Sequence, residues 1–256
     1  MEERSTRGRG RVKIVVAKNV DELGGMAARE FAAAARASVD ARGRFTVALS
    51  GGSTPRVLYR SLRDISMPWA KTYFFFGDER NVPADGDESN FRLARDELFT
   101  PLEIDAGSVC RWLTELQDPE AIALDYEERL REFFSTSASD PFPVFDLILL
   151  GMGGDGHTAS LFPGTEALDA ASRLAVQNPV AQLGTIRFTL TFPVINSARN
   201  VVFMVAGADK AQALKEVLEG ERQPHLYPSQ MVRPAKGNLT WFLDEAAAGL
   251  LSQKNI

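Results

Sequence analysis

The chain holds few of the residues that build disulfides, metal centres or membrane spans. Its 256 residues include one cysteine, Cys110, and two histidines, His157 and His225. One cysteine cannot form an intrachain disulfide, and zinc sites usually use more nitrogen or sulfur ligands than this chain offers. No apolar run is long enough to span a bilayer, and no charged-then-apolar signal segment is found. These absences favour a cytoplasmic protein without membrane contact.

Positive charge and several catalytic motifs are also scarce. The formal net charge is −5 and the sequence pI is about 5.3, which argues against a nucleic-acid surface, because phosphate-backbone binding needs a concentrated basic face. A small anionic ligand needs only a few local cations. The chain has no Gly-Lys-Ser/Thr of a Walker A loop, no GxSxG elbow and no HExxH motif. Adenosine triphosphate hydrolysis, serine hydrolase chemistry and a zinc protease are therefore disfavoured.

Strand-like and helix-like segments alternate along the chain. Expected strands are 11–17, 45–49, 73–76, 147–150, 186–190, 201–206 and 239–243. Expected helices are 20–34, one opened by Pro55, 91–99, 119–134, 208–219 and 244–251. Such alternation predicts an α/β fold with a doubly wound, mostly parallel sheet and helices on both faces. The length suits one large or two small domains; we favour a flexible basic tail at 1–10 and a single domain at 11–256.

The most informative segment is 147–165, LILLGMGGDGHTASLFPGT. Four large aliphatic residues, Leu147 to Leu150, are typical of a strand buried on both faces. The glycine-rich loop that follows should lie at the carboxyl edge of the sheet, where open α/β sheets bind ligands. Asp155 and His157 are the polar groups in it, and a histidine in this setting is a candidate for acid–base chemistry.

Two other loops also follow predicted strands. The segment 50–55, SGGSTP, precedes a helix, so backbone N–H groups with the Ser53 and Thr54 hydroxyls could cradle an anion; a simple capped turn fits equally well. The segment 77–83, GDERNVP, could clamp a ligand through its charges or be a solvated loop. Arg187 and Lys210 stand beside strand ends and could pair with a phosphate dianion.

Alternative uses of these residues are weaker. A metal could bind to Asp78, Glu79, Asp155 and His157, but no paired-histidine spacing supports it. His225 lies between Pro224 and Leu226 with no comparable polar setting, so we assign it a structural role. Cys110 is expected to be a small core residue, since an isolated cysteine without a nearby histidine is more often buried than nucleophilic.

Taken together, the motifs resemble those of the cytosolic α/β 6-phosphogluconolactonase family. The matching segments are SGGSTP at 50–55, FFGDERNVP at 75–83, ESN at 88–90, DLILLGMGGDGHTASLFPGT at 146–165, RFTLT at 187–191, GADK at 207–210 and LTWFLDEAA at 239–247. They run in order over most of the chain, and GDGHTASLFP is highly specific. The resemblance implies a single-domain fold, related to glucosamine-6-phosphate deaminase, that hydrolyses 6-phospho-D-glucono-1,5-lactone to 6-phosphogluconate in the pentose phosphate pathway.

The resemblance also implies the roles of individual residues, without a metal or organic cofactor. His157 is the expected catalytic base, with Asp155 and Asp78 as acidic neighbours. The expected phosphate and sugar contacts are Ser50, Gly51, Gly52, Ser53, Thr54, Arg80, Gly154, Arg187 and Lys210. Which cation meets the phosphate and which polarises the lactone stays open. The expected partner is a small sugar-phosphate lactone, and the protein is expected to be a monomer or small homo-oligomer.

Two rival functions follow from related folds. An amino-sugar phosphate deaminase would carry a glutamate and an asparagine shortly after the loop histidine, where this chain has Thr158, Ala159, Ser160, Leu161 and Phe162. A sugar-phosphate sensor that regulates transcription would need a DNA-binding helix pair, and only a short arginine-bearing tail precedes the first predicted strand. Both comparisons favour the lactonase.

Overall fold

The larger of two sheets organises the molecule. The computed structural model describes residues 12–252, and the predicted tail at 1–10 lies outside them. Six strands form an all-parallel sheet in the order β1-β9-β8-β5-β2-β3. Their bounds are β1 Val12–Ala17, β2 Phe45–Leu49, β3 Thr72–Phe76, β5 Leu147–Leu150, β8 Asn200–Val205 and β9 Asn238–Asp244. The predicted α/β class with a mostly parallel sheet is therefore confirmed.

A smaller antiparallel sheet stands beside the large one. Its order is β4-β7-β6, with bounds β4 Asp78–Arg80, β6 Ala175–Val180 and β7 Thr185–Leu190. The sequence predicted a strand at β7 but a loop at β4 and no strand at β6. The three consecutive charged residues of β4 show none of the apolar pattern that predicts a strand. In β6, Pro179 with two polar residues breaks the expected alternation.

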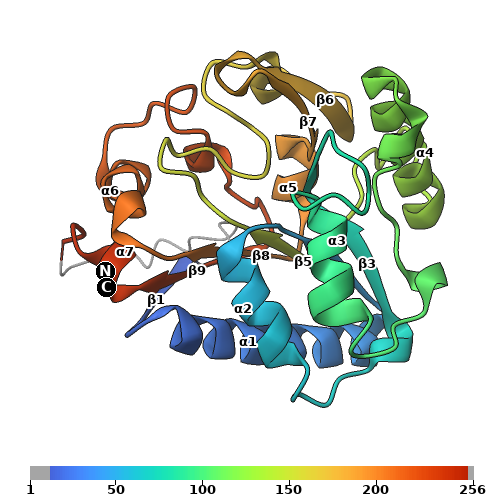
Figure 1. Ribbon diagram of the computed structural model, residues 1–256, viewed down its shortest axis with the longest axis horizontal. Helices are drawn as coiled ribbons and strands as arrows, with labels where there is room; N and C mark the ends of the chain where they lie inside the picture. Colours follow the sequence, from blue (N-terminus) through green and yellow to red (C-terminus); the bar gives the residue numbers. More distant parts are fainter. Residues whose placement is uncertain (1–11, 253–256) are drawn as a thin grey trace, which may run out of the picture.

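Helices cover both faces of the large sheet, as predicted. They are α1 Val20–Arg42, α2 Ser53–Leu62, α3 Asn90–Ala94, α4 Pro119–Phe134, α5 Phe192–Ser197, α6 Ala211–Glu219 and α7 Glu245–Ala248. In Figure 1, α1 runs below the large sheet, whereas α4 and the small sheet lie above it. A π-helical turn, Arg95–Phe99, continues α3 and completes the helix predicted over 91–99.

Local sequence signals set the ends of the two longest helices. The Asn19 side chain accepts a hydrogen bond from the backbone N–H of Glu22 at 2.9 Å and begins α1, and Gly43 ends it with φ of 75°. Asp118 caps α4 and Pro119 occupies its first turn, as the sequence predicted. Between the layers, β2 and β5 are buried along their whole lengths, which explains why β5 is wholly apolar and β2 is apolar except for Thr46.

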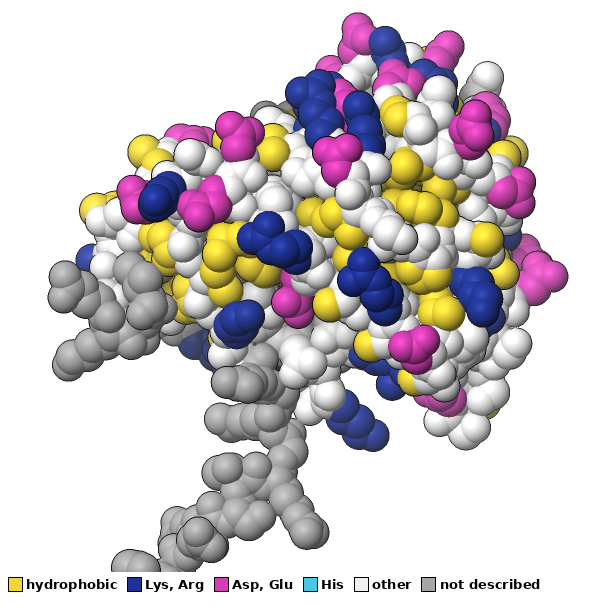
Figure 2. Space-filling view, turned by 90° about the horizontal axis from the view of Figure 1, so that it is seen from below, with side chains coloured by type: hydrophobic (Ala, Val, Ile, Leu, Met, Phe, Trp, Pro, Cys, Tyr) yellow, Lys and Arg dark blue, Asp and Glu magenta, His cyan; other side chains and the backbone are white. Residues whose placement is uncertain are grey.

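The face of the molecule below α1 carries charges of both signs. Figure 2 shows Lys and Arg side chains dispersed among apolar, polar and acidic ones on the face seen from below. Within residues 12–252, no helix combines the length and the apolar character that crossing a membrane requires.

Candidate active site

Three loops meet where β2, β5 and β8 end. These strands are neighbours in the parallel sheet, so the loops after Leu49, Leu150 and Val205 leave it at the same edge. A Cβ placed on Gly151 would lie 3.9 Å from Ser50 Oγ, and one on Gly154 would lie 4.0 Å from Lys210 Nζ. The edge therefore brings Ser50, the glycine loop and Lys210 together.

His157 and Asp155 form a hydrogen-bonded pair within the glycine loop. His157 Nδ1 lies 2.6 Å from Asp155 Oδ1, which also accepts the backbone N–H of His157 at 3.1 Å. The imidazole stacks on Phe162, with ring centroids 4.0 Å apart. Among residues 12–252 no group hydrogen-bonds to Nε2, and the His157 side chain is 27% exposed. A carboxylate on Nδ1 with an open Nε2 is an arrangement suited to a general base.

The pairing with His157 favours the charged form of Asp155. Partial burial raises the pKa of the Asp155 carboxyl, but its hydrogen bonds with His157 and the charge of the imidazole outweigh burial, so the pKa falls below its usual value. Asp155 is therefore a carboxylate at neutral pH. It orients the imidazole through Nδ1 and can stabilise positive charge that develops on the ring.

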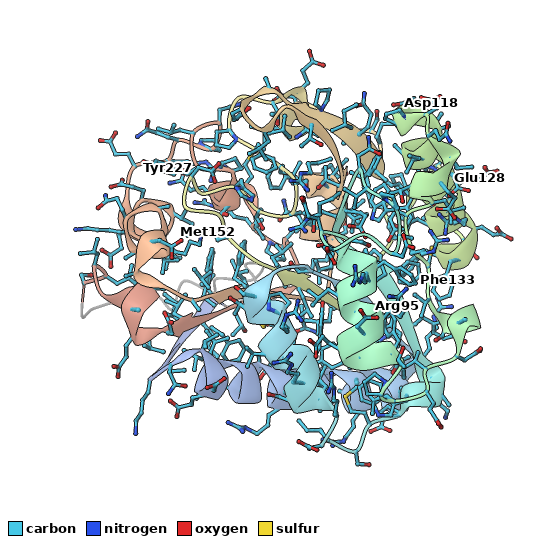
Figure 3. The ribbon with its side chains drawn as sticks, viewed as in Figure 1. Arg95, Asp118, Glu128, Phe133, Met152 and Tyr227 are labelled. Carbon is cyan, nitrogen blue, oxygen red and sulfur yellow. The ribbon has the colours of Figure 1, made fainter. Side chains whose placement is uncertain are left out.

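Two glycines of the loop are required by their surroundings. A Cβ on Gly153 would lie 2.1 Å from His157 Nδ1, so only glycine lets the backbone pass beside the imidazole. Gly156 has φ of 78°, and its carbonyl accepts hydrogen bonds from the Ser229 backbone and hydroxyl. Figure 3 shows Met152 of this loop and Tyr227, which packs against Gly156, on the opposite side of the molecule from α4.

Asp78 and Glu79 begin β4 and point to opposite sides of it. Both are buried, although the sequence left them as either ligand contacts or solvated charges. Glu79 accepts hydrogen bonds from the backbone of Arg80, Asn90 and Phe91, so it caps the start of α3. Burial raises the pKa of Glu79, and these hydrogen bonds partly oppose the rise. The Asp78 carboxylate contacts Ser160 and Asn90.

Arg80 and Arg187 face each other across β4 and β7. They are register partners in the antiparallel pair, which puts two guanidinium groups on one face. Arg80 donates to the backbone carbonyl of Glu88, and neither arginine forms an ion pair with a carboxylate of residues 12–252. Arg187 Nε is buried without a hydrogen-bond partner in the same part of the chain. Burial and then the charge of Arg80 lower the pKa of Arg187. An anion would relieve both costs.

The turn at 50–53 is shaped by two glycines for different reasons. Gly52 has φ of 103°, and α2 begins after it without a side-chain cap. A Cβ on Gly51 would lie 1.7 Å from Asn90 Oδ1, so the Asn90 amide occupies the space beside it. The backbone N–H groups of Ser53 and Thr54 at the start of this ten-residue helix remain available to an anion.

Lys210 completes the set of cations predicted from sequence. It follows Gly207 in the loop after β8, and its Nζ lies 2.8 Å from Asp209 Oδ2 and close to Gly154. The Lys210 side chain is 27% exposed and that of Asp209 is 71% exposed, so solvent weakens this ion pair. Among residues 12–252 no group of three His, Cys, Asp or Glu side chains could hold a metal ion. The structure gives the weak metal alternative no ligand set there.

Sequence reasoning missed two residues that contact Asp78. Asn90 was quoted within the ESN motif, and Ser160 within the segment after His157, but neither was assigned a role. Nothing in their local pattern shows that they approach residue 78, because Ser160 is 82 positions away from it. Both residues lie in segments that match the family's motifs, and this match was the one indication in the sequence that they have a role.

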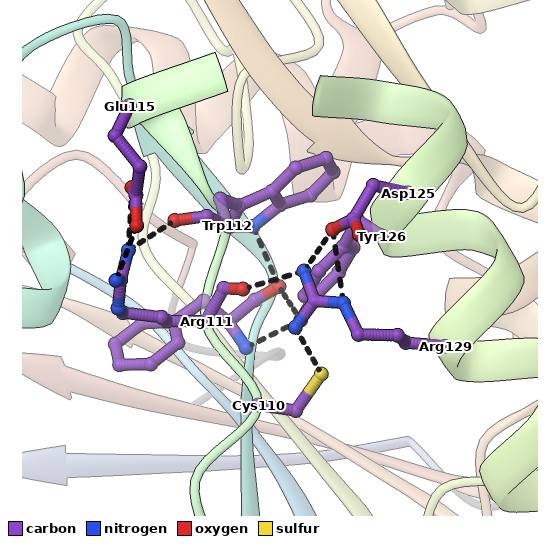
Figure 4. A network of polar contacts seen from close by, with 8 residues as sticks. Cys110, Arg111, Trp112, Glu115, Asp125, Tyr126 and Arg129 are labelled. Carbon is purple, nitrogen blue, oxygen red and sulfur yellow. Dashed lines mark hydrogen bonds and ion pairs between the residues drawn. The ribbon is translucent and has the colours of Figure 1, made fainter. Parts of the chain in front are cut away.

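Cys110 lies in a separate network that supports the end of β3. Tyr126 of α4 donates to the Phe76 carbonyl and accepts the Phe76 N–H, and Trp112 Nε1 donates to the same carbonyl. Figure 4 shows Arg129 between this group and the Cys110 sulfur, which lies 3.2 Å from its Nη1. Burial raises the pKa of the Cys110 thiol to about 11, so the thiol is not activated.

Comparison with known proteins agrees with this geometry. The family model described as glucosamine-6-phosphate isomerases/6-phosphogluconolactonase matches residues 18–241. The chain belongs to this family. It is 46% identical to the 6-phosphogluconolactonase of Synechocystis sp. over 206 residues, which cover 80% of this chain and 84% of the relative. It is 41% identical to the human 6-phosphogluconolactonase over 250 residues, 93% of each chain.

A solved structure shows the same likeness in three dimensions. The 6-phosphogluconolactonase from Trypanosoma cruzi superposes with a TM-score of 0.85 at 31% sequence identity, covering 96% of this chain and 99% of that one. The family therefore includes both of the enzyme types that the sequence left as alternatives, and its 6-phosphogluconolactonases share the fold of this chain.

Proposed function

We propose that this protein hydrolyses 6-phospho-D-glucono-1,5-lactone to 6-phospho-D-gluconate, in the oxidative branch of the pentose phosphate pathway. The single observation that carries the proposal is the His157–Asp155 pair, with Nε2 open at a rim that also bears Lys210. The 6-phosphogluconolactonases of Synechocystis and human, at 46% and 41% identity, support the choice of substrate. A small anionic sugar ester fits this combination of one base and several cations.

In the proposed mechanism, His157 acts as the base. Neutral Nε2 takes a proton from water as the water oxygen attacks the lactone carbonyl, and Asp155 stabilises the imidazolium through Nδ1. The imidazolium then returns the proton to the ring oxygen as the ester bond breaks. General-base catalysis of this kind contributes roughly 10²–10⁴-fold, and a reactive lactone needs no covalent intermediate or cofactor.

The remaining rim residues would bind the substrate at its two ends. Arg80, Arg187 and Lys210 supply full positive charges, and the Ser50–Thr54 turn supplies backbone N–H groups and hydroxyls. The buried, unpartnered Nε of Arg187 supports an anion at that point, and we assign the phosphate there. Lys210, close to Gly154 in the histidine loop, would then stabilise the negative charge that develops on the lactone carbonyl oxygen.

A glucosamine-6-phosphate isomerase is the second candidate, because the family description names it. The segment after His157 disfavours it, since Thr158, Ala159, Ser160, Leu161 and Phe162 include no carboxylate that could assist proton transfer to a sugar ring. A cytoplasmic setting belongs to the main proposal, because the proposed substrate is a phosphorylated intermediate of central metabolism.

Parallel assays separate the candidates. Acid release from freshly prepared 6-phosphogluconolactone is followed in a pH-stat, with the spontaneous rate subtracted, and ammonia release from glucosamine 6-phosphate is followed separately. Acid release above background without ammonia supports the lactonase. Ammonia release would assign the chain to the isomerase type, and binding of 6-phosphogluconate without turnover would indicate a sensor.

A further inference from the structure

The Asp78 carboxylate is held on both oxygens by buried side chains. Ser160 Oγ donates to Oδ2 at 2.8 Å, and Asn90 Nδ2 donates to Oδ1 at 3.3 Å and to the Asp78 backbone carbonyl at 3.0 Å. Asp78, Ser160 and Asn90 are 7%, 2% and 2% exposed. A carboxylate enclosed in this way has little freedom to approach a substrate and then withdraw with a proton.

These contacts join the histidine loop to β4. Ser160 follows His157 by three positions, and Ala159 between them has φ of 48°, a tight turn for a residue other than glycine. The Ser160 carbonyl accepts a hydrogen bond from Asn178 Nδ2 at 2.8 Å, and its N–H lies 3.4 Å from Thr189 Oγ1. Since Thr189 is the register partner of Asp78, Ser160 is fixed on the small sheet from two sides.

Asn90 extends the same connection to the turn at 50–53. Its Oδ1 is buried without a hydrogen-bond partner in residues 12–252 and lies against Gly51, where no side chain would fit. The amide therefore touches Gly51 on one side and Asp78 on the other. The histidine loop, β4 and the turn at 50–53 are in this way linked through one carboxylate and its two partners.

We propose that Asp78 is a positioning residue, which Ser160 and Asn90 hold so that the His157 loop, Arg80 and the 50–53 turn keep a fixed arrangement. Asp78 then carries no proton during turnover. The inference rests on the proposed function, and it replaces the expectation from resemblance that Asp78 is an acidic group of the catalytic set. Hydrolysis of a lactone needs one base, which His157 supplies. Moving hydrogen between sugar carbons would need a second side chain that can approach the sugar and carry a proton. Because the Ser160 hydroxyl holds Asp78 in place, it favours hydrolysis over isomerisation.

Asp78→Asn is the first test, because an amide keeps the shape and can still hydrogen-bond to both partners. Positioning predicts that kcat for lactone hydrolysis falls by less than about tenfold and that the pH–rate profile keeps its limbs. A proton carrier would lose about 10²-fold or more, together with one limb of that profile. The second result would overturn the proposal.

Ser160→Ala removes the hydroxyl that holds Asp78. We expect kcat to fall about tenfold with KM changed less than threefold, because the imidazole is displaced while the phosphate contacts stay. Ser160→Thr restores a hydroxyl and should recover most of the loss. The double variant with Asp78→Asn should be no slower than Ser160→Ala, since both act through one contact. Ser61→Ala, whose hydroxyl bonds to Val57 within α2, is the matched control and should behave as wild type.

A nuclear magnetic resonance measurement keeps this inference separate from the proposed function. The chain has two histidines, so His225→Gln assigns the His157 imidazole signal. Positioning predicts that the signal moves in Ser160→Ala, which loses the contact, but not in Ser61→Ala, whether or not the lactone is hydrolysed. An unmoved His157 signal in folded Ser160→Ala would refute positioning. Absence of turnover in the wild type, with the signal moved as expected, would refute only the proposed function.

Discussion

Two groups of arginines in this protein differ in whether they form ion pairs with carboxylates. In the middle of the π-helical turn Arg95–Phe99, the Glu97 carboxylate forms ion pairs with Arg56, Arg60 and Arg63 at 2.6, 2.8 and 2.7 Å. At the rim of the site, Arg80 and Arg187 face each other without any carboxylate partner in residues 12–252. In the first group a carboxylate pairs directly with the arginines, whereas in the second Asp78, Glu79 and Glu88 act on Arg187 only through their charge, without an ion pair in residues 12–252. Arginines used for folding are thereby distinguished from arginines available to a ligand.

The ionisation of the two groups reflects the same difference. Hydrogen bonds and charge from Arg60 and Arg56 lower the pKa of Glu97 from 4.5 to about 2, in spite of its burial. Burial and the neighbouring Arg80 instead lower the pKa of Arg187, which means that its charge is destabilised in the protein alone. The Glu97 cluster therefore stabilises the folded state, whereas the charge of Arg187 is disfavoured by its surroundings.

The largest effect should come from His157→Gln, which tests whether catalysis takes place at the sheet edge where β2, β5 and β8 end. Glutamine removes the base but keeps a polar side chain, so we expect kcat to fall by roughly 10²–10⁴-fold. Affinity for 6-phosphogluconate, measured by calorimetry, should stay nearly unchanged. Turnover close to wild type would remove His157 from the proposed mechanism.

Arg187→Met tests the unpaired group directly. Loss of a charged hydrogen bond to phosphate, about 1.5–3 kcal/mol, should raise KM by roughly 10–100-fold. The melting temperature should stay level or rise, because a half-buried charge that Arg80 repels is removed. Arg60→Met at Glu97 is the matched control, with the opposite outcome: a lower melting temperature and an unchanged KM. If the two variants behaved alike, the distinction between the arginine groups would fail.

Glu97→Gln tests the paired group through its pH dependence. The variant should lose on the order of 1–2 kcal/mol of unfolding free energy at pH 7, allowing for the solvent exposure of the arginines. Because the folded-state pKa of Glu97 is lowered to about 2, its stabilisation is complete above the ordinary value of 4.5 and is lost as pH falls between these values. Urea unfolding at pH 7, 5, 4 and 3 should show the two proteins converging. A constant difference would contradict this origin.

The smallest effect is expected at Cys110. Here the guanidinium of Arg129 contacts a neutral thiol and is not available to a ligand. With a pKa near 11, hardly any thiolate is present at pH 7. Iodoacetamide should leave the folded protein unmodified, and Cys110→Ala should keep full activity. Rapid modification with loss of turnover would show that the network in Figure 4 is more open than its contacts indicate.

The large sheet could be predicted because its signals are local. The apolar run at β5, the largely apolar segment at β2 and the proline that begins α4 each act within a few residues, whereas α1 extends to Arg42, beyond the predicted end at residue 34. The small sheet could not be predicted in full. A strand as short as Asp-Glu-Arg has no hydrophobic alternation, and it forms only because β7 offers it partners.

The site shows the same limit. The loops after β2, β5 and β8 could be placed at one edge, since neighbouring parallel strands end together. The contact of Ser160 with Asp78 depends on how the small sheet sits against the glycine loop, and no spacing in the sequence encodes that. Glu79 likewise looks like a ligand clamp in sequence, although its oxygens are occupied by the start of α3.

Gly77 has a consequence for how a substrate is received. Its N–H bonds to Leu49 of the large sheet, and its carbonyl accepts the N–H of Leu190 of the small one, at 2.8 Å in both cases. One residue thus hydrogen-bonds to strands of both sheets and ties the two together at this point. Movement of one sheet against the other here would have to break these bonds, so this part of the site should lose little ordering entropy when a ligand binds.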